Sequence, residues 1–334
     1  MSVQSDVHVK MDDRVRLMSA VLAATAYPEK AQKLKPHGTH THARATRKYV
    51  VRFDEHPAIQ ATRGLLDQGT PLEALFALVT LMRWPQLEID GLPPWAPSRY
   101  NSLLWDFYQS ANVAELWEKD ADLWDKAHTQ AEHVFTDVKL RPFFEQFVGP
   151  VEESLIFIPN ISYPTDYDVG FKMGNNLFAI VPPPLAWGDS PPWPYDETTM
   201  ITQTLRSAIM VYGREIIKAY LRGNLDKLDE VTRMDLPVSD QFRAEHPTWE
   251  DQFTALFLSA AVAMYLEDHV DEREFKSYML MEKRARGMSI LPGTVSVLRR
   301  FLQEKDSSDK YSTLIEFLPI FPRQLRVAQK IVQF

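Results

Sequence analysis

Two short apolar runs, residues 155–158 and 177–181, interrupt a sequence in which most other segments have the apolar spacing of helices. Both runs are bounded by Asn, Pro, Gly or Asp, which is typical of strands. Helical patterns precede them over residues 12–147 and follow them over residues 196–318. This order predicts a predominantly α-helical α+β fold with a small β-sheet in the middle of the chain, and it disfavours a doubly wound α/β fold.

The character of the sequence changes near residue 150. We therefore expect a helical N-terminal lobe over residues 1–150 and a second lobe over residues 151–334, which holds the sheet and further helices. No Gly/Ser-rich or highly charged spacer lies at this boundary. The two lobes are therefore also compatible with one continuous domain.

Local signals predict where several helices begin. Thr70-Pro71-Leu72-Glu73 has the form of a capping box, which predicts a helix start at Thr70. Thr248 resembles the N-cap of the most apolar helix in the chain. Residues 29–48 are polar, basic and irregular in pattern, which predicts a loop.

Composition excludes several classes of protein. The 37 Lys and Arg residues against 45 Asp and Glu give a net charge of −8, which argues against nucleic acid as a partner. The chain has no Cys, so it forms no disulfide, thiolate zinc site or iron–sulfur site. The longest apolar run, residues 252–266, is shorter than the roughly 18 residues that a membrane span needs, and predicts a buried helix. With a polar N-terminus, these features predict a cytoplasmic protein with no membrane partner.

Histidines at positions 37, 40 and 42 form the first candidate site. The spacing His37-x-x-His40-x-His42 would offer two or three imidazoles to a divalent metal such as zinc. A complete site would need a carboxylate or another ligand from elsewhere in the chain. The alternative interpretation is a solvated loop in a basic segment.

Aromatic residues concentrate in the first half of the chain. They are Phe53, Trp84, Trp95, Trp105, Phe107, Tyr108, Trp117 and Trp124. Aromatic side chains on helices can line an apolar pocket, but they also form ordinary hydrophobic core. The sequence leaves both interpretations open.

The order of the segments resembles a family of uncharacterised bacterial proteins related to gluzincin-type zinc metallopeptidases. The resemblance covers roughly residues 10–290. It rests on residues 13–18, residues 53–59, the apolar helix from Pro71, residues 177–182 before a long helix, and residues 249–253. It implies a metallopeptidase-like helical scaffold.

The resemblance also implies a degenerate zinc site. In such peptidases the long helix carries His-Glu-x-x-His, and a glutamate on the next helix completes the site. Here Gln203 and Ser207 occupy the positions of the two histidines, Thr204 that of the general base, and Glu250 that of the third ligand. Gln, Thr and Ser do not supply these functions, so the resemblance implies a scaffold without the peptidase chemistry and without a cofactor.

The expected function is therefore binding without catalysis, through the former active-site cleft. An unidentified protein or peptide would lie beside residues 177–181, a strand whose edge we expect to be exposed. One alternative is a metal-dependent hydrolase with a displaced site at His37, His40 and His42. Another is a structural or assembly protein. The oligomeric state stays open.

Overall fold

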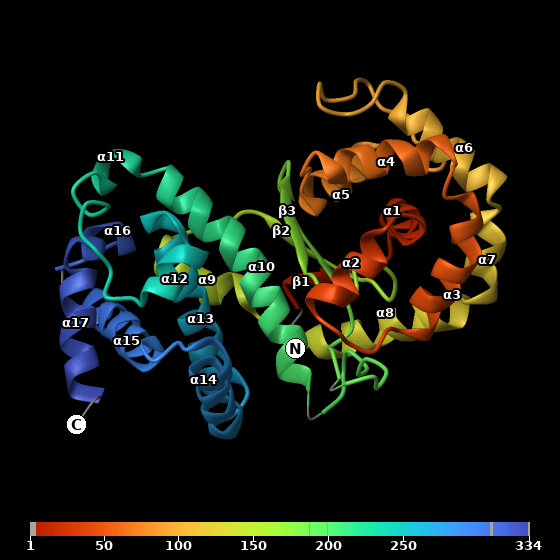
Figure 1. Cartoon of the computed structure of the whole chain (residues 1–334). Coiled ribbons are helices and arrows are strands. Elements are labelled where there is room, and N and C mark those ends of the chain that lie inside the picture. The colour runs from red at the N-terminus through yellow and green to blue at the C-terminus, as the bar shows by residue number, and fades with distance from the viewer. Residues whose placement is uncertain (1–4, 187, 199, 308–309, 333–334) are drawn as a thin grey trace. The chain divides into compact units, whose positions relative to one another are not determined.

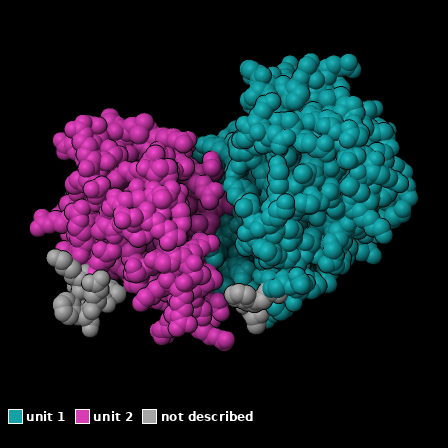
Figure 2. Space-filling view, in the orientation of Figure 1, with its two compact units in different colours: residues 1–138, 153–208 teal, residues 139–152, 209–334 magenta. Residues whose placement is uncertain are grey.

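The computed structural model describes residues 5–186, 188–198, 200–307 and 310–332. Its contacts divide the chain into two compact units, which Figure 2 shows in different colours. Unit 1 comprises residues 1–138 and 153–208, and unit 2 comprises residues 139–152 and 209–334.

Helices are the main secondary structure of both units, in agreement with the predicted α+β class (Figure 1). Unit 1 contains α1 (Asp13–Ala24), α2 (Tyr27–Leu34), α3 (Thr41–Val50), η1 (Val51–Phe53), α4 (Pro57–Asp67), α5 (Leu72–Leu81), α6 (Tyr100–Ser110), α7 (Val113–Lys119) and α8 (Ala121–Phe135). Helix α10 (Ile201–Arg222) begins in unit 1 and continues into unit 2. Unit 2 also contains α9 (Leu140–Val148), α11 (Leu225–Leu228), α12 (Asp240–Glu245), α13 (Trp249–His269), α14 (Glu272–Arg286), α15 (Leu291–Ser307), α16 (Leu314–Phe317), η2 (Leu318–Ile320) and α17 (Phe321–Val332).

A four-stranded sheet lies in unit 1. Its strands are β1 (Val7–Val9), β2 (Ser154–Pro159), β3 (Val169–Met173) and β4 (Asn176–Val181), in the spatial order β1-β2-β4-β3. The first three strands in that order are parallel, and β3 runs antiparallel to β4. Strands β2 and β4 confirm the two predicted apolar runs. Because β1 pairs with β2, the sheet belongs with the N-terminal helices, and this division differs from the expected lobes over residues 1–150 and 151–334.

Both faces of the sheet are covered. Ile156 and Ile180 belong to the core that includes α1, α3, α4 and α5. The side chain of Phe157 alternates to the opposite face, where its ring lies 4.7 Å from that of Phe135 in α8. Strands that are buried on both faces need apolar residues in every position. This explains why β2 and β4 have continuous apolar sequences.

Helix α1 lies in the centre of unit 1. Nine of its twelve residues are buried, and Figure 1 shows helices α3 to α7 in an arc around it. It packs against α3, α4 and α5. The three residues of α1 that are not buried are the charged residues Asp13, Arg14 and Arg16. Their partners are described below.

Helix α13 has the same central place in unit 2. It packs against α14 and α15, and its residues 252–266 are all buried except Ala255, as predicted. The Thr248 side chain accepts a hydrogen bond from the amide of Asp251, which confirms the predicted N-cap. No helix within the described ranges is both long and apolar enough to cross a membrane.

Two local predictions were wrong. Pro71, not Thr70, is the N-cap of α5, and no side chain caps that helix. Residues 29–48 contain most of α2 and α3 instead of a loop. The buried face of α3 consists of His42, Ala43, Thr46 and Val50, so it lacks the large apolar residues that identify a helix in a sequence.

Candidate functional site

The three histidines of the 37–42 segment have separate partners. His37 Nε2 lies 2.8 Å from Thr165 Oγ1. His40 is the N-cap of α3, and its Nδ1 accepts a hydrogen bond from the amide of His42 at 3.1 Å. Among the described residues, no group of three or more His, Asp or Glu side chains is arranged to hold a metal ion. The structure therefore does not gather these three imidazoles into one cluster.

His42 has the partners of a catalytic histidine in a buried setting. Its Nδ1 lies 2.7 Å from Asp120 Oδ2, and its Nε2 lies 3.1 Å from Thr46 Oγ1. An acid, a histidine and a hydroxyl in this order form the triad of nucleophilic hydrolases. However, His42 and Thr46 are 2% and 1% exposed, and the indole of Trp124 also donates to Nε2 at 3.2 Å. A substrate carbonyl cannot reach Thr46 Oγ1, so this network holds α3 against α8.

His40 makes the stability of the protein depend on pH. Burial, together with the charges of His42, Arg44 and Lys126, lowers the pKa of the His40 imidazole to about 4 and outweighs the opposing charge of Asp120. The unfolded chain keeps the ordinary pKa of 6.5, so it binds more protons between these two values. The stability that neutral His40 contributes is therefore present above pH 6.5 and is lost as the pH falls towards 4.

We expect His40→Asn to reduce this acid sensitivity. Asparagine keeps an N-cap acceptor but does not titrate. The variant should match the wild type at neutral pH and lose less stability near pH 5, the middle of the window between the two pKa values. Urea unfolding of both proteins at the two pH values measures the difference. An equal loss of stability near pH 5 in both proteins would contradict this prediction.

The positions implied by the peptidase resemblance lie on two helices. Gln203, Thr204 and Ser207 occupy the first turns of α10, where Thr204 is buried and donates to the carbonyl of Tyr195 at 2.9 Å. Glu250 lies in the first turn of α13, with an oxygen 3.6 Å from Nε of Arg222, the last residue of α10. The partner of Glu250 thus lies at the opposite end of α10 from Thr204.

Strand β4 has no exposed edge. It pairs with β2 along one side and with β3 along the other, so the expectation of an exposed edge along residues 177–181 was wrong. The sheet instead ends at β1 and at β3. Among the described residues, β3 and not β4 therefore has an unpaired edge.

The hairpin between β3 and β4 determines which groups β3 presents outward. Two residues, Gly174 and Asn175, connect Met173 to its partner Asn176. In a two-residue hairpin the closing pair is hydrogen-bonded, and bonding alternates along the strand. Val169, Phe171 and Met173 therefore bond to β4, whereas the backbone groups of Gly170 and Lys172 point away from it. Within the described part of the chain these outward groups have no backbone partner.

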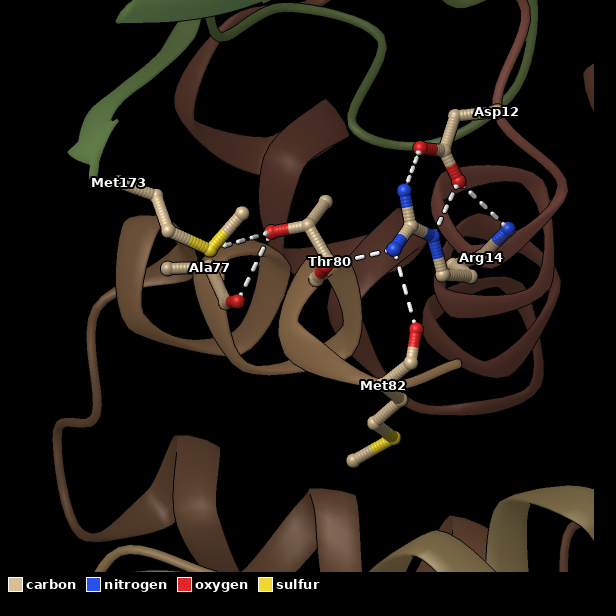
Figure 3. Close-up of polar contacts among 6 residues, drawn as sticks. All are labelled: Asp12, Arg14, Ala77, Thr80, Met82 and Met173. Atoms are coloured by element: carbon tan, nitrogen blue, oxygen red, sulfur yellow. Dashed lines mark hydrogen bonds and ion pairs between the residues drawn. The ribbon is translucent and has the colours of Figure 1, made fainter. Parts of the chain in front are cut away.

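A cluster around Arg14 fixes the end of β3 (Figure 3). The Arg14 guanidinium donates from Nη1 to the carbonyls of Thr80 and Met82 at 2.6 and 3.0 Å, and its other nitrogens engage the carboxylate of Asp12. A cation is favoured at the C-terminal end of a helix such as α5, where the last carbonyls lack intrahelical partners. The Thr80 hydroxyl lies 3.6 Å from Sδ of Met173. The cluster therefore joins α1, the end of α5 and the end of β3.

Sequence reasoning missed this cluster. Asp12 was visible as an acidic residue at a helix start, and its carboxylate caps α1 by accepting from the amide of Arg14. The signal for Arg14 was a charged residue in the first turn of a helix that is buried from Leu17 onward, because a charge in such surroundings needs partners. No sequence signal identified those partners as the carbonyls of α5.

Comparisons with known proteins identify no relative of this chain: no family model, curated protein or solved structure matches it.

Proposed function

We propose that this protein binds an extended segment of a peptide or protein partner, without catalysis, at the outer edge of β3. The observation that carries this proposal is the pair of outward backbone positions, Gly170 and Lys172, which have no backbone partner among the described residues. An extended peptide that aligns with such an edge forms main-chain hydrogen bonds and adds a strand to the sheet.

The surroundings of β3 favour such binding. Gly170 has no side chain to shield its backbone, and the ammonium group of Lys172 is held by the carboxylate of Glu153. Val169 and Phe171 are anchored in the core, and the Arg14 cluster fixes the end of the strand. A strand held in place this way loses little conformational entropy when it binds a partner.

The absence of catalysis in this proposal rests on residue chemistry. If the chain descends from a gluzincin-like scaffold, Gln203, Thr204 and Ser207 stand where zinc ligands and a general base would be. None of these side chains replaces an imidazole ligand or a carboxylate base. The proposed protein is thus a cytoplasmic binding protein on a metallopeptidase-like scaffold.

A pair of substitutions at Lys172 tests the proposal. Lys172→Pro removes the outward N–H without removing a bond to β4, since proline is tolerated where the N–H points away from the sheet. Lys172→Ala removes the same side chain and keeps the N–H. We expect peptides selected from a random displayed library on the wild-type protein to bind the alanine variant with similar affinity. The proline variant should bind them at least tenfold more weakly, the effect of about 1.4 kcal/mol.

Circular dichroism of both variants checks that the fold is retained. The proposal would be overturned if no peptide were enriched. Equal binding to the proline and alanine variants would overturn it as well, because the bound edge would then not be β3.

A further inference from the structure

We infer that the half-buried aromatic surface of unit 1 binds a basic segment of a partner through its Arg or Lys side chains. This surface, the aromatic face, consists of Trp84, Trp105, Tyr108 and Trp117. The aromatic face is a separate binding site from the edge of β3, and the inference does not depend on the proposed function.

The rings of the aromatic face form one contiguous group. Tyr108 is the central ring, with centroid distances of 5.1 Å to Trp84, 5.2 Å to Trp105 and 5.5 Å to Trp117. Trp84, Trp105 and Tyr108 remain partly accessible, whereas Trp117 is buried. The structure thus combines the two interpretations that the sequence left open: the inner ring is core, and the outer rings form a surface.

An internal arginine shows how this face accommodates a cation. The Arg16 guanidinium lies 4.3 Å from the ring centre of Trp117 and 4.7 Å from that of Trp124. Its Nη1 donates to the carboxylate of Asp13 at 2.9 Å. A cation over aromatic rings with a carboxylate beside it is a favourable arrangement. The outer rings offer the same chemistry to a cation from a partner.

The charge around the aromatic face selects such a partner. Residues 106–137 contain eight Asp and Glu residues and only two Lys. Glu118 follows Trp117 in α7, and Asp125 follows Trp124 in α8; both are exposed and have no ion pair among the described residues. Burial and the negative charges of Asp13 and Glu118 raise the pKa of the Tyr108 hydroxyl. Unpaired carboxylates beside aromatic rings attract a basic segment and repel an acidic one.

Fluorescence anisotropy with labelled peptides tests this inference. The probes are a decapeptide of alternating Arg and Gly, the same peptide with Glu in place of Arg, and a proline-rich decapeptide. We expect the Arg peptide alone to bind, with an affinity that falls as salt is added. No binding of the Arg peptide, or equal binding of the proline-rich peptide, would overturn the inference.

Matched variants locate the binding surface. Glu118→Gln with Asp125→Asn removes two exposed charges beside the aromatic face and should weaken binding of the Arg peptide about fivefold to tenfold. Asp226→Asn with Glu230→Gln removes two exposed charges from unit 2 and should leave binding unchanged. Trp105→Leu should weaken it about threefold, the range of an exposed cation–π contact. Equal weakening by both charge pairs would overturn the inference, because only the net charge would then matter.

Discussion

Replacing Arg14 with alanine is expected to lower the free energy of unfolding by about 3 kcal/mol, because two carbonyls and a partly buried carboxylate lose their partner. The substitution removes both hydrogen bonds to the end of α5 and leaves the carboxylate of Asp12, whose side chain is 12% exposed, without its cation. Urea denaturation followed by circular dichroism measures the change.

Arg14→Lys serves as the matched control. Lysine keeps the charge but lacks the planar fork that reaches Asp12 and two carbonyls together. We therefore expect an intermediate loss of stability. A loss below about 1 kcal/mol for the alanine variant, the value of an exposed ion pair, would show that the cluster does not hold α5 and β3.

A second large effect is expected at Gly213, where α10 packs closely inside unit 2. A Cβ atom added there would lie 2.5 Å from Cδ2 of Leu258 and 2.9 Å from Cε1 of Phe144. Gly213→Val should therefore cost about 3 kcal/mol, at the upper end of the cost of overpacking a core.

Gly64, in the middle of α4, provides the control. Nothing lies within 4 Å of a Cβ atom built at this position. Gly64→Val should change stability by less than about 0.5 kcal/mol, because valine is a slightly better helix former than glycine and meets no neighbour. Similar losses at positions 64 and 213 would contradict the close packing of α10.

The sequence predicted the parts of the fold that large apolar residues mark. The central strands β2 and β4 and the buried helix α13 are confirmed because each has a continuous apolar run. Strand β1 was missed because Val7-His8-Val9 is too short for an alternating pattern, and β3 because Gly170 and Lys172 are typical of an edge. The pairing of β1 with β2 joins residues 7–9 to residues 155–157, and no local signal reveals such a contact.

Predicting the candidate sites required knowledge of tertiary contacts even more than predicting the fold did. The spacing of His37, His40 and His42 made them a candidate metal site, with a solvated loop as the alternative, and in the structure the three imidazoles have separate partners. The edge of β4 was predicted to be exposed because β3 was not recognised beside it. The resemblance to gluzincin-type peptidases supplied positions for Gln203 and Glu250, and its consequences stay predictions.

The start of α1 connects both surfaces proposed here. Arg14 reaches the end of α5 and, through Thr80, the end of β3. Two residues further, Arg16 reaches Trp117 and Trp124 beside the aromatic face. These two arginines contact different neighbours. Arg14→Ala should therefore weaken peptide binding at β3 and leave the contacts of Arg16 with Trp117 and Trp124 unchanged.

Amide hydrogen exchange at Gly170 and Lys172 tests the binding role of β3 most directly. In the free protein both amides should exchange quickly, because their N–H groups point away from β4. A peptide selected on the wild-type protein should slow exchange at both positions and should be recovered intact. Unchanged exchange at Gly170 and Lys172 with a bound peptide, or cleavage of that peptide, would contradict non-catalytic binding at this edge.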